Sequence, residues 1–162
     1  GFAPQETMVL ILVLNLAAAL GALVFGYVQD RIGHRLALSL TLAGWIAVCL
    51  IAALAQNKAQ FWVAATIAGL CMGSSQSAGR AMVGLFAPPQ QLAEFFGLWT
   101  TATRIASIVG PISYGLITWL AGGNQRIAIV ACSAFFVAGL LFLWPMRVQR
   151  GREAALASVQ GA

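Results

Sequence analysis

The chain has 162 residues, of which 60% are hydrophobic and only 8% are charged, and its mean hydropathy is +0.88. No soluble domain of this length needs so much apolar surface, so the composition excludes a soluble globular protein. The formal net charge of +5 does not indicate nucleic-acid binding, because the arginines are scattered singly along apolar runs. We therefore expect a protein that is embedded in the lipid bilayer and does not bind nucleic acid.

Five apolar segments are long enough to cross a hydrocarbon core, which needs about 20 helical residues. They predict an all-α, polytopic membrane helix bundle (residues 8–145) with spans at about 8–27, 36–55, 61–86, 95–120 and 127–145. Residues 1–7 are expected to be an external leader rather than a signal peptide, because they carry Glu6 and no basic region. The polar residues 146–162 are expected to form a frayed tail.

The distribution of positive charge predicts the orientation. Five arginines flank the spans on one side, against two basic residues on the other, which places the richer side in the cytoplasm. Three tryptophans lie near span ends, where indole rings favour the membrane interface, whereas Trp45 and Trp99 fit that belt less well. The larger basic set is Arg31, Arg35, Arg147, Arg150 and Arg152; the smaller is Lys58 and Arg126.

Two further arginines lie inside predicted spans. At a helical rise of about 1.5 Å per residue, Arg80 is roughly 9 Å and Arg104 roughly 14 Å from the cytoplasmic ends of their spans. Such charges are costly unless they face protein or water. The alternatives are that they extend toward the headgroups or pair with a carboxylate on another helix. No carboxylate lies inside any of the five predicted spans.

Helical spacing places each arginine on a stripe of small and polar residues. Close helix packing alone would explain such stripes, but tight packing around a guanidinium would bury an unpaired charge, so we expect a hydrated cavity. Asn15 could add a polar contact there, although an interhelical hydrogen bond is its plainer role. The stripe around Arg80 is Gly69, Gly73, Gln76, Ser77 and Gly84; the stripe around Arg104 is Gly97, Thr100, Thr101, Ser107, Pro111 and Gly115.

The connection between the first two spans carries the pattern Gly-x-x-x-Asp-Arg-x-Gly-x-Arg in residues 26–35. It resembles the loop signature of the major facilitator superfamily of secondary transporters. Together with three further blocks, the chain is similar to the vacuole-effluxer-like branch, which includes the yeast vacuolar amino-acid effluxer and bacterial permeases. The further blocks are residues 73–80 (GSSQSAGR), 93–97 (AEFFG) and 108–111 (IVGP). Gly79 and His34 depart from the pattern, since family members commonly carry serine and a basic residue there.

The resemblance implies the C-terminal half of a twelve-helix transporter, beginning at its eighth helix, in which two bundles rock about a midplane site. It further implies a cytoplasmic latch, whose aspartate contacts a helix N-terminus of the missing N-terminal six-helix half and whose arginines bridge neighbouring helices. The implied latch residues are Gly26, Asp30, Arg31, Gly33 and Arg35; the expected packing or hinge positions are Gly73, Gly110, Pro111 and Gly115.

The function we expect is therefore that of a secondary transporter fragment, multi-pass in a bacterial inner membrane, moving a small anionic or zwitterionic solute such as an amino acid. The alternative is a membrane scaffold without transport. An enzyme is disfavoured, because the only histidine, His34, lies in the surface connection and no nucleophile or base accompanies it. No metal or cofactor is expected, since Cys49, Cys71 and Cys132 lack ligand spacing. The cavity candidates are Arg80, Arg104, Gln76, Thr100, Ser107 and Asn15.

Overall fold

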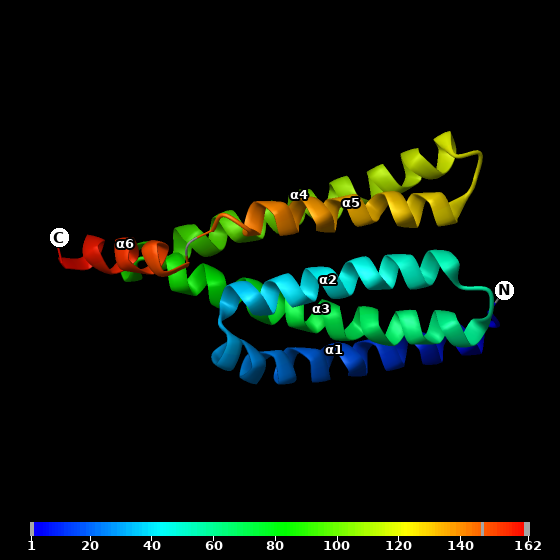
Figure 1. Cartoon of the computed structure of the whole chain (residues 1–162), viewed down its shortest axis with the longest axis horizontal. Helices are drawn as coiled ribbons and strands as arrows, with labels where there is room; N and C mark the ends of the chain where they lie inside the picture. Colours follow the sequence, from blue (N-terminus) through cyan, green and yellow to red (C-terminus); the bar gives the residue numbers. More distant parts are fainter. Residues whose placement is uncertain (1, 147, 161–162) are drawn as a thin grey trace.

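The computed structural model describes residues 2–146 and 148–160, and the described chain is helical throughout apart from short turns (Figure 1). No strand occurs in these residues, which confirms the predicted all-α class. The elements in chain order are α1 (Pro4–Ile32), α2 (His34–Leu54), α3 (Lys58–Phe86), the 3-10 helix η1 (Pro89–Gln91), α4 (Leu92–Leu120), α5 (Gln125–Leu143) and α6 (Val148–Gln160).

An asparagine side chain caps the start of two of these helices, α3 and α5. Asn57 precedes α3, and its Oδ1 accepts a hydrogen bond from the Gln60 amide at 2.9 Å. Asn124 does the same for α5, accepting from the Arg126 amide at 3.1 Å. Each cap satisfies a main-chain donor that the first helical turn leaves without a partner. The two short connections that precede α3 and α5 are thereby fixed by their own sequence.

The connection between α1 and α2 is shorter than predicted. Instead of a loop over residues 28–35, α1 continues to Ile32 and α2 begins at His34, so that Gly33 alone makes the turn. Gly33 has a φ of +85°, a conformation that a side chain disfavours. The charged residues of the signature therefore lie on the last turn of one helix and the first turn of the next.

The expectation of a frayed tail was wrong for the described part, since residues 148–160 form α6. The segment is rich in alanine and other good helix formers, and it packs against the end of α3. Gly151 is the contact point: a Cβ added there would lie 2.5 Å from the Phe86 ring. Arg147, counted among the tail's basic residues, lies outside the described residues.

The core is built on α3, which packs most extensively against α1 and also contacts α2. Small residues let α1 and α3 approach closely, because a Cβ added to Gly73 would lie 1.8 Å from the Ala18 carbonyl oxygen. In the opposite direction, a Cβ on Gly21 would lie 2.3 Å from the Leu70 carbonyl oxygen. This is the small-residue packing typical of membrane helices.

Trp45 links α2 to both α3 and α5. Its Nε1 donates to Ser75 Oγ at 3.0 Å, and its ring stacks on Phe136 of α5 at a centroid distance of 5.3 Å. Beside it, Thr41 Oγ1 donates to Ser74 Oγ at 3.3 Å, and both residues are buried. These contacts explain why Trp45 does not belong to an interfacial belt.

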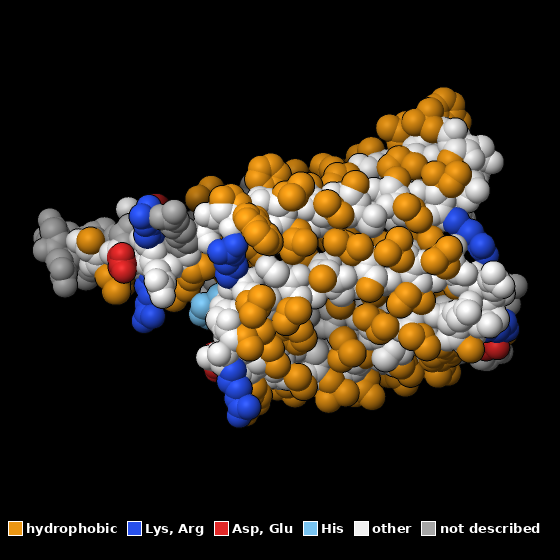
Figure 2. All heavy atoms as spheres, viewed as in Figure 1, with side chains coloured by type: hydrophobic (Ala, Val, Ile, Leu, Met, Phe, Trp, Pro, Cys, Tyr) orange, Lys and Arg blue, Asp and Glu red, His pale blue; other side chains and the backbone are white. Residues whose placement is uncertain are grey.

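The lateral surface of the bundle is apolar. Figure 2 shows hydrophobic side chains spread along the helices, with lysines, arginines and acidic residues near the two ends. Large apolar side chains such as Phe142 (82% exposed) project outward, and exposed apolar surface on this scale is typical of a membrane or protein interface. Among the described residues, α1, α2 and α5 are long and apolar enough to cross a membrane. The five-span division stays a prediction, although α3 and α4, with 29 residues each, are about 44 Å long.

Candidate functional site

Arg80 lies in the last third of α3 and faces α4. Its guanidinium carbon is 5.6 Å from the ring centroid of Trp99, within the range of a cation–π interaction. Gly79 borders the indole, and a Cβ added there would lie 3.5 Å from Trp99 Nε1, at ordinary van der Waals distance. The arginine itself is exposed. The Arg80–Trp99 pair therefore links the polar part of α3 to α4.

The stripe around Arg80 divides into two parts. Gly69 and Gly73 lie buried against α1, so close helix packing, the alternative explanation of such stripes, accounts for them. Gln76 and Arg80 are exposed one helical turn apart, and no neighbour lies within 4 Å of a Cβ added to Gly84. The open and polar part of the stripe is thus its second half, from Gln76 onward.

Arg104 belongs to the exposed face of α4, a helix without a buried residue in the described structure. Two hydroxyls one turn to either side bond to their own helix: Thr100 Oγ1 donates to the Phe96 carbonyl at 2.8 Å, and Ser107 Oγ to the Arg104 carbonyl at 2.7 Å. Each hydroxyl keeps oxygen lone pairs that can accept further bonds. The face therefore offers a cation flanked by small polar groups.

The remaining candidates are placed as follows. Asn15 is exposed on α1 and donates from Nδ2 to the Ile11 carbonyl at 2.8 Å, so the hydrogen bond it makes lies within its own helix rather than between helices. Pro111 lies inside α4. A Cβ added to Gly110 or Gly115 would meet nothing within 4 Å, so their predicted packing partners are not among the described residues.

The structure does not bring all candidates into one cluster. It joins Arg80 to Trp99, and Thr100 follows Trp99 directly on α4. Arg104 lies one further turn along α4. Among the described residues, the recorded ion pair is that of Lys58 with Glu6, so neither Arg80 nor Arg104 has a carboxylate partner there. Chemically, the arrangement can bind an anion or accept a counter-charge from elsewhere.

The signature segment bridges helices at one end of the bundle. Arg35, at the start of α2, donates to the Trp144 carbonyl oxygen just after α5, and its guanidinium lies 5.9 Å from the Trp144 ring centroid. Asp30 and Arg31 are exposed, and Gly26 is half-buried. Gln29 is buried and bonds to His34 across the turn. Arg35 thus connects the start of α2 to the residue that follows α5.

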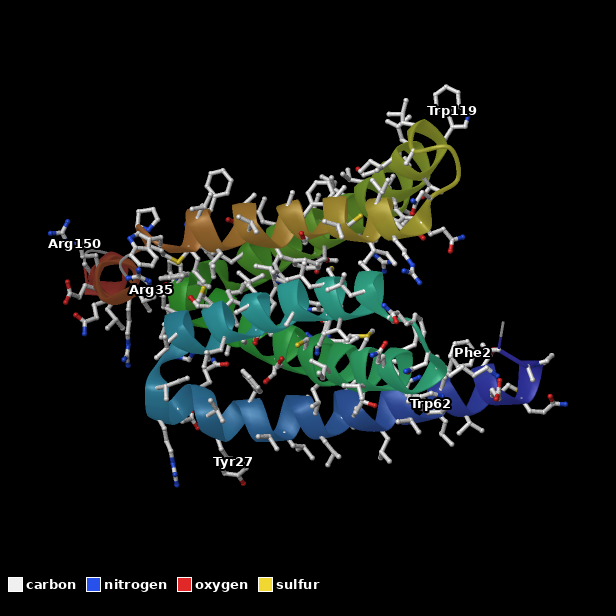
Figure 3. All side chains as sticks on the ribbon, turned by 45° about the vertical axis from the view of Figure 1, so that its right-hand side comes forward. Phe2, Tyr27, Arg35, Trp62, Trp119 and Arg150 are labelled. Atoms are coloured by element: carbon white, nitrogen blue, oxygen red, sulfur yellow. The ribbon has the colours of Figure 1, made fainter. Side chains whose placement is uncertain are left out.

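The other end of the bundle is closed by contacts at the starts of α1, α3 and α5. Lys58 Nζ lies 2.7 Å from Glu6 Oε2, and Phe2 lies against Phe61 with ring centroids 5.4 Å apart. Arg126 donates to the Ala55 carbonyl at 2.8 Å. Figure 3 places Phe2 at the end opposite Arg35 and Arg150. The two basic groups predicted for this end thus have partners within it.

Two tryptophans acquire roles that the sequence did not reveal. From the sequence, Trp144 is expected at the membrane interface, because it lies near a span end, whereas Trp99 fits that expectation less well. Their contacts with Arg80 and Arg35 depend on how α3 meets α4 and how α2 meets α5, which no local spacing encodes. The signal in the sequence that could have indicated these contacts is the presence of an arginine and a tryptophan on helices expected to be neighbours.

Fold and site together define an integral membrane helix bundle with two arginines that lack acidic partners among the described residues. The chain matches the family described as vacuole effluxer Atg22-like over residues 1–156, and it belongs to that family. This confirms the resemblance found in the signature and the three blocks.

Curated relatives extend the comparison. The chain is 23% identical to the uncharacterized MFS-type transporter YxiO of Bacillus subtilis strain 168, over 88% of this chain and 33% of the relative. It is 29% identical to autophagy-related protein 22 of Cryptococcus neoformans, over 95% of this chain and 31% of the relative. It is 26% identical to the 3-(3-hydroxy-phenyl)propionate transporter of Escherichia coli K12, over 86% of this chain and 35% of the relative. The chain thus spans about a third of the length of these relatives. No solved structure matches it.

Proposed function

We propose that the chain forms part of one bundle of a secondary transporter that moves a small solute by alternating access. Membership of an effluxer-like family and similarity to two proteins named as transporters support this role. Alternating access requires a second bundle against which the first can rock. We place that second bundle in an N-terminal six-helix half of the same polypeptide, as the greater length of the relatives suggests.

The observation that carries the proposal is the pair of exposed arginines, Arg80 and Arg104, on two helices of 29 residues each. A charged side chain at the centre of a membrane helix costs about 3 kcal/mol or more unless it faces water or a partner. With no carboxylate partner among the described residues, both arginines suit a water-filled path and the anionic group of a solute. Gln76, Thr100, Ser107 and Asn15 would line the same path.

The substrate class that fits is an anionic or zwitterionic metabolite, such as an amino acid or another carboxylate. Arginine binds carboxylates through paired N–H donors. The Escherichia coli relative is named as a transporter of a propionate, which is itself a carboxylate. For this chain we propose the bacterial inner membrane, with Arg31, Arg35 and the C-terminal helix on the cytoplasmic side.

At that end, Asp30 would act as a latch toward the second bundle. It is exposed on the last turn of α1, where a carboxylate can reach a helix N-terminus on another bundle and accept its free amides. Gly26 and Gly33 would set the position of this turn, while Arg31 and Arg35 would bridge neighbouring helices. The contact of Arg35 with Trp144 supports this role for Arg35.

Transport by the complete protein tests the proposal. The protein is reconstituted in vesicles, and uptake of labelled amino acids and of 3-(3-hydroxyphenyl)propionate is measured for the wild type, Arg104→Ala and Arg104→Lys. Loss of a charge-assisted hydrogen bond should lower transport by about tenfold or more in Arg104→Ala, and lysine should not restore it fully, since it lacks the planar fork. Arg126→Ala is the matched control. Unchanged transport in both Arg104 variants would remove this residue from the substrate path.

A further inference from the structure

A groove of about 710 Å³ opens at the end of the bundle that carries the signature segment. It lies between the start of α2, the end of α5 and the start of α6. Figure 3 labels Arg35 and Arg150 at this end. The lining residues used below are Arg35, Leu36, Leu40, Ala43, Leu140 and Trp144.

The groove has a polar mouth. One N–H of the Arg35 guanidinium donates to the Trp144 carbonyl oxygen, and the guanidinium carries five N–H donors in all. No described carboxylate lies within 4 Å of it. The end of α1, the start of α2 and the start of α6 together carry more arginines than carboxylates. The described charged residues are Arg31, Arg35, Arg150 and Arg152 against Asp30 and Glu153.

Behind the mouth, the wall is apolar. Along α2 it runs from Arg35 past Leu40 to Ala43, a distance of about 12 Å at the rise of an α-helix. Leu140 of α5 forms the facing side. Trp144 is exposed beside Arg35, in keeping with the preference of indole for the membrane interface. A positive mouth and an apolar channel of this depth complement a molecule with an anionic head and an acyl chain.

We propose that this groove binds an anionic phospholipid, with its phosphate on Arg35 and one acyl chain along Leu36, Leu40, Ala43 and Leu140. The free N–H donors of the guanidinium make charge-assisted hydrogen bonds to the phosphate oxygens. The excess of arginines over carboxylates favours a headgroup with net negative charge over a zwitterionic one. The bound lipid joins α2, α5 and α6 at the membrane surface.

Native mass spectrometry of the complete protein tests the proposal, with dioleoyl phosphatidylglycerol and dioleoyl phosphatidylcholine as probes. The wild type should retain phosphatidylglycerol about fivefold better, the effect of one basic side chain at a membrane surface. Arg35→Gln should lose that preference and Arg35→Lys should keep it. Arg126→Gln is the matched control, since Arg126 also donates to a carbonyl but lies at the other end.

A second variant tests the apolar part independently of charge. Ala43→Phe fills the channel and should lower the retention of both lipids, even if Arg35→Gln does not fold. Equal retention of the two lipids by the wild type, or an unchanged preference in a folded Arg35→Gln protein, would overturn the proposal. Displacement of the lipid by glycerol phosphate at equal concentration would also overturn it, because the groove would then bind soluble anions without using its apolar wall.

Discussion

The guanidinium carbon of Arg80 on α3 lies 5.6 Å from the ring centroid of Trp99 on α4. This contact connects the tightly packed part of the bundle to a helix that has no buried residue in the described structure. It also gives the arginine an electrostatic partner that leaves its N–H donors free, because a cation–π contact uses the face of the ring rather than a hydrogen bond. Arg80 can therefore be held in place and still bind an anion.

The Arg80–Trp99 contact predicts a graded response to substitution at Trp99. Trp99→Phe keeps an aromatic face and should lower the apparent affinity for the transported anion only slightly, whereas Trp99→Leu should lower it by about threefold to thirtyfold, the range of a cation–π contact. The measurement is the concentration dependence of transport by the complete protein. Trp119→Leu, an exposed tryptophan at the far end of α4, is the control, and an equal loss in it would contradict the assignment.

Close packing of α1 on α3 predicts that Gly73 tolerates no side chain. Gly73→Ala would place its Cβ against the Ala18 carbonyl, and such overpacking costs about 1–3 kcal/mol of stability. Gly115→Ala should be neutral or stabilising, because nothing lies within 4 Å of its added Cβ. Thermal unfolding of the complete protein in detergent measures both. A Gly73→Ala protein as stable as the wild type would show that the two helices are not in such close contact.

The latch assignment predicts that Asp30→Asn slows switching between inward- and outward-open states without affecting membrane insertion. Asparagine keeps the size of the side chain but removes the charge that favours a helix N-terminus, an interaction typically worth about 0.3–1 kcal/mol. Transport turnover of the complete protein should fall while its amount in the membrane stays the same. Normal turnover in a normally inserted variant would exclude the latch role.

The ends of the helices show what the sequence could and could not predict. The apolar segments alone locate all five long helices, because runs of this length and hydropathy are typical of membrane helices. They do not mark helix termini, since Gln29, Asp30 and Arg31 continue α1 beyond the hydrocarbon-length run. The expectation for the tail was wrong for a similar reason: its polarity excludes a membrane span, but not a helix that packs through Gly151 against Phe86.

The candidate site was predictable only in part. The two arginines and their polar neighbours follow from charge and helical spacing, which act within one helix. Which side of each stripe packs against another helix depends on tertiary contacts, and so Gly69 and Gly73 turned out to belong to the α1 interface. Trp99 and Trp144 were identified only once neighbouring helices were placed side by side.

The polar face of α4 that carries Arg104 is expected to border water inside the membrane. Thiol labelling tests it directly in a complete protein whose Cys49, Cys71 and Cys132 are replaced by alanine, because only a hydrated thiol ionises and reacts readily. Ser107→Cys lies on the Arg104 face, whereas Val109→Cys lies about 140° from Arg104 around the helix.

A membrane-impermeant maleimide should label Ser107→Cys and leave Val109→Cys unlabelled. Labelling of neither position from either side of the membrane would contradict it, since the same bundle would then be a dry scaffold.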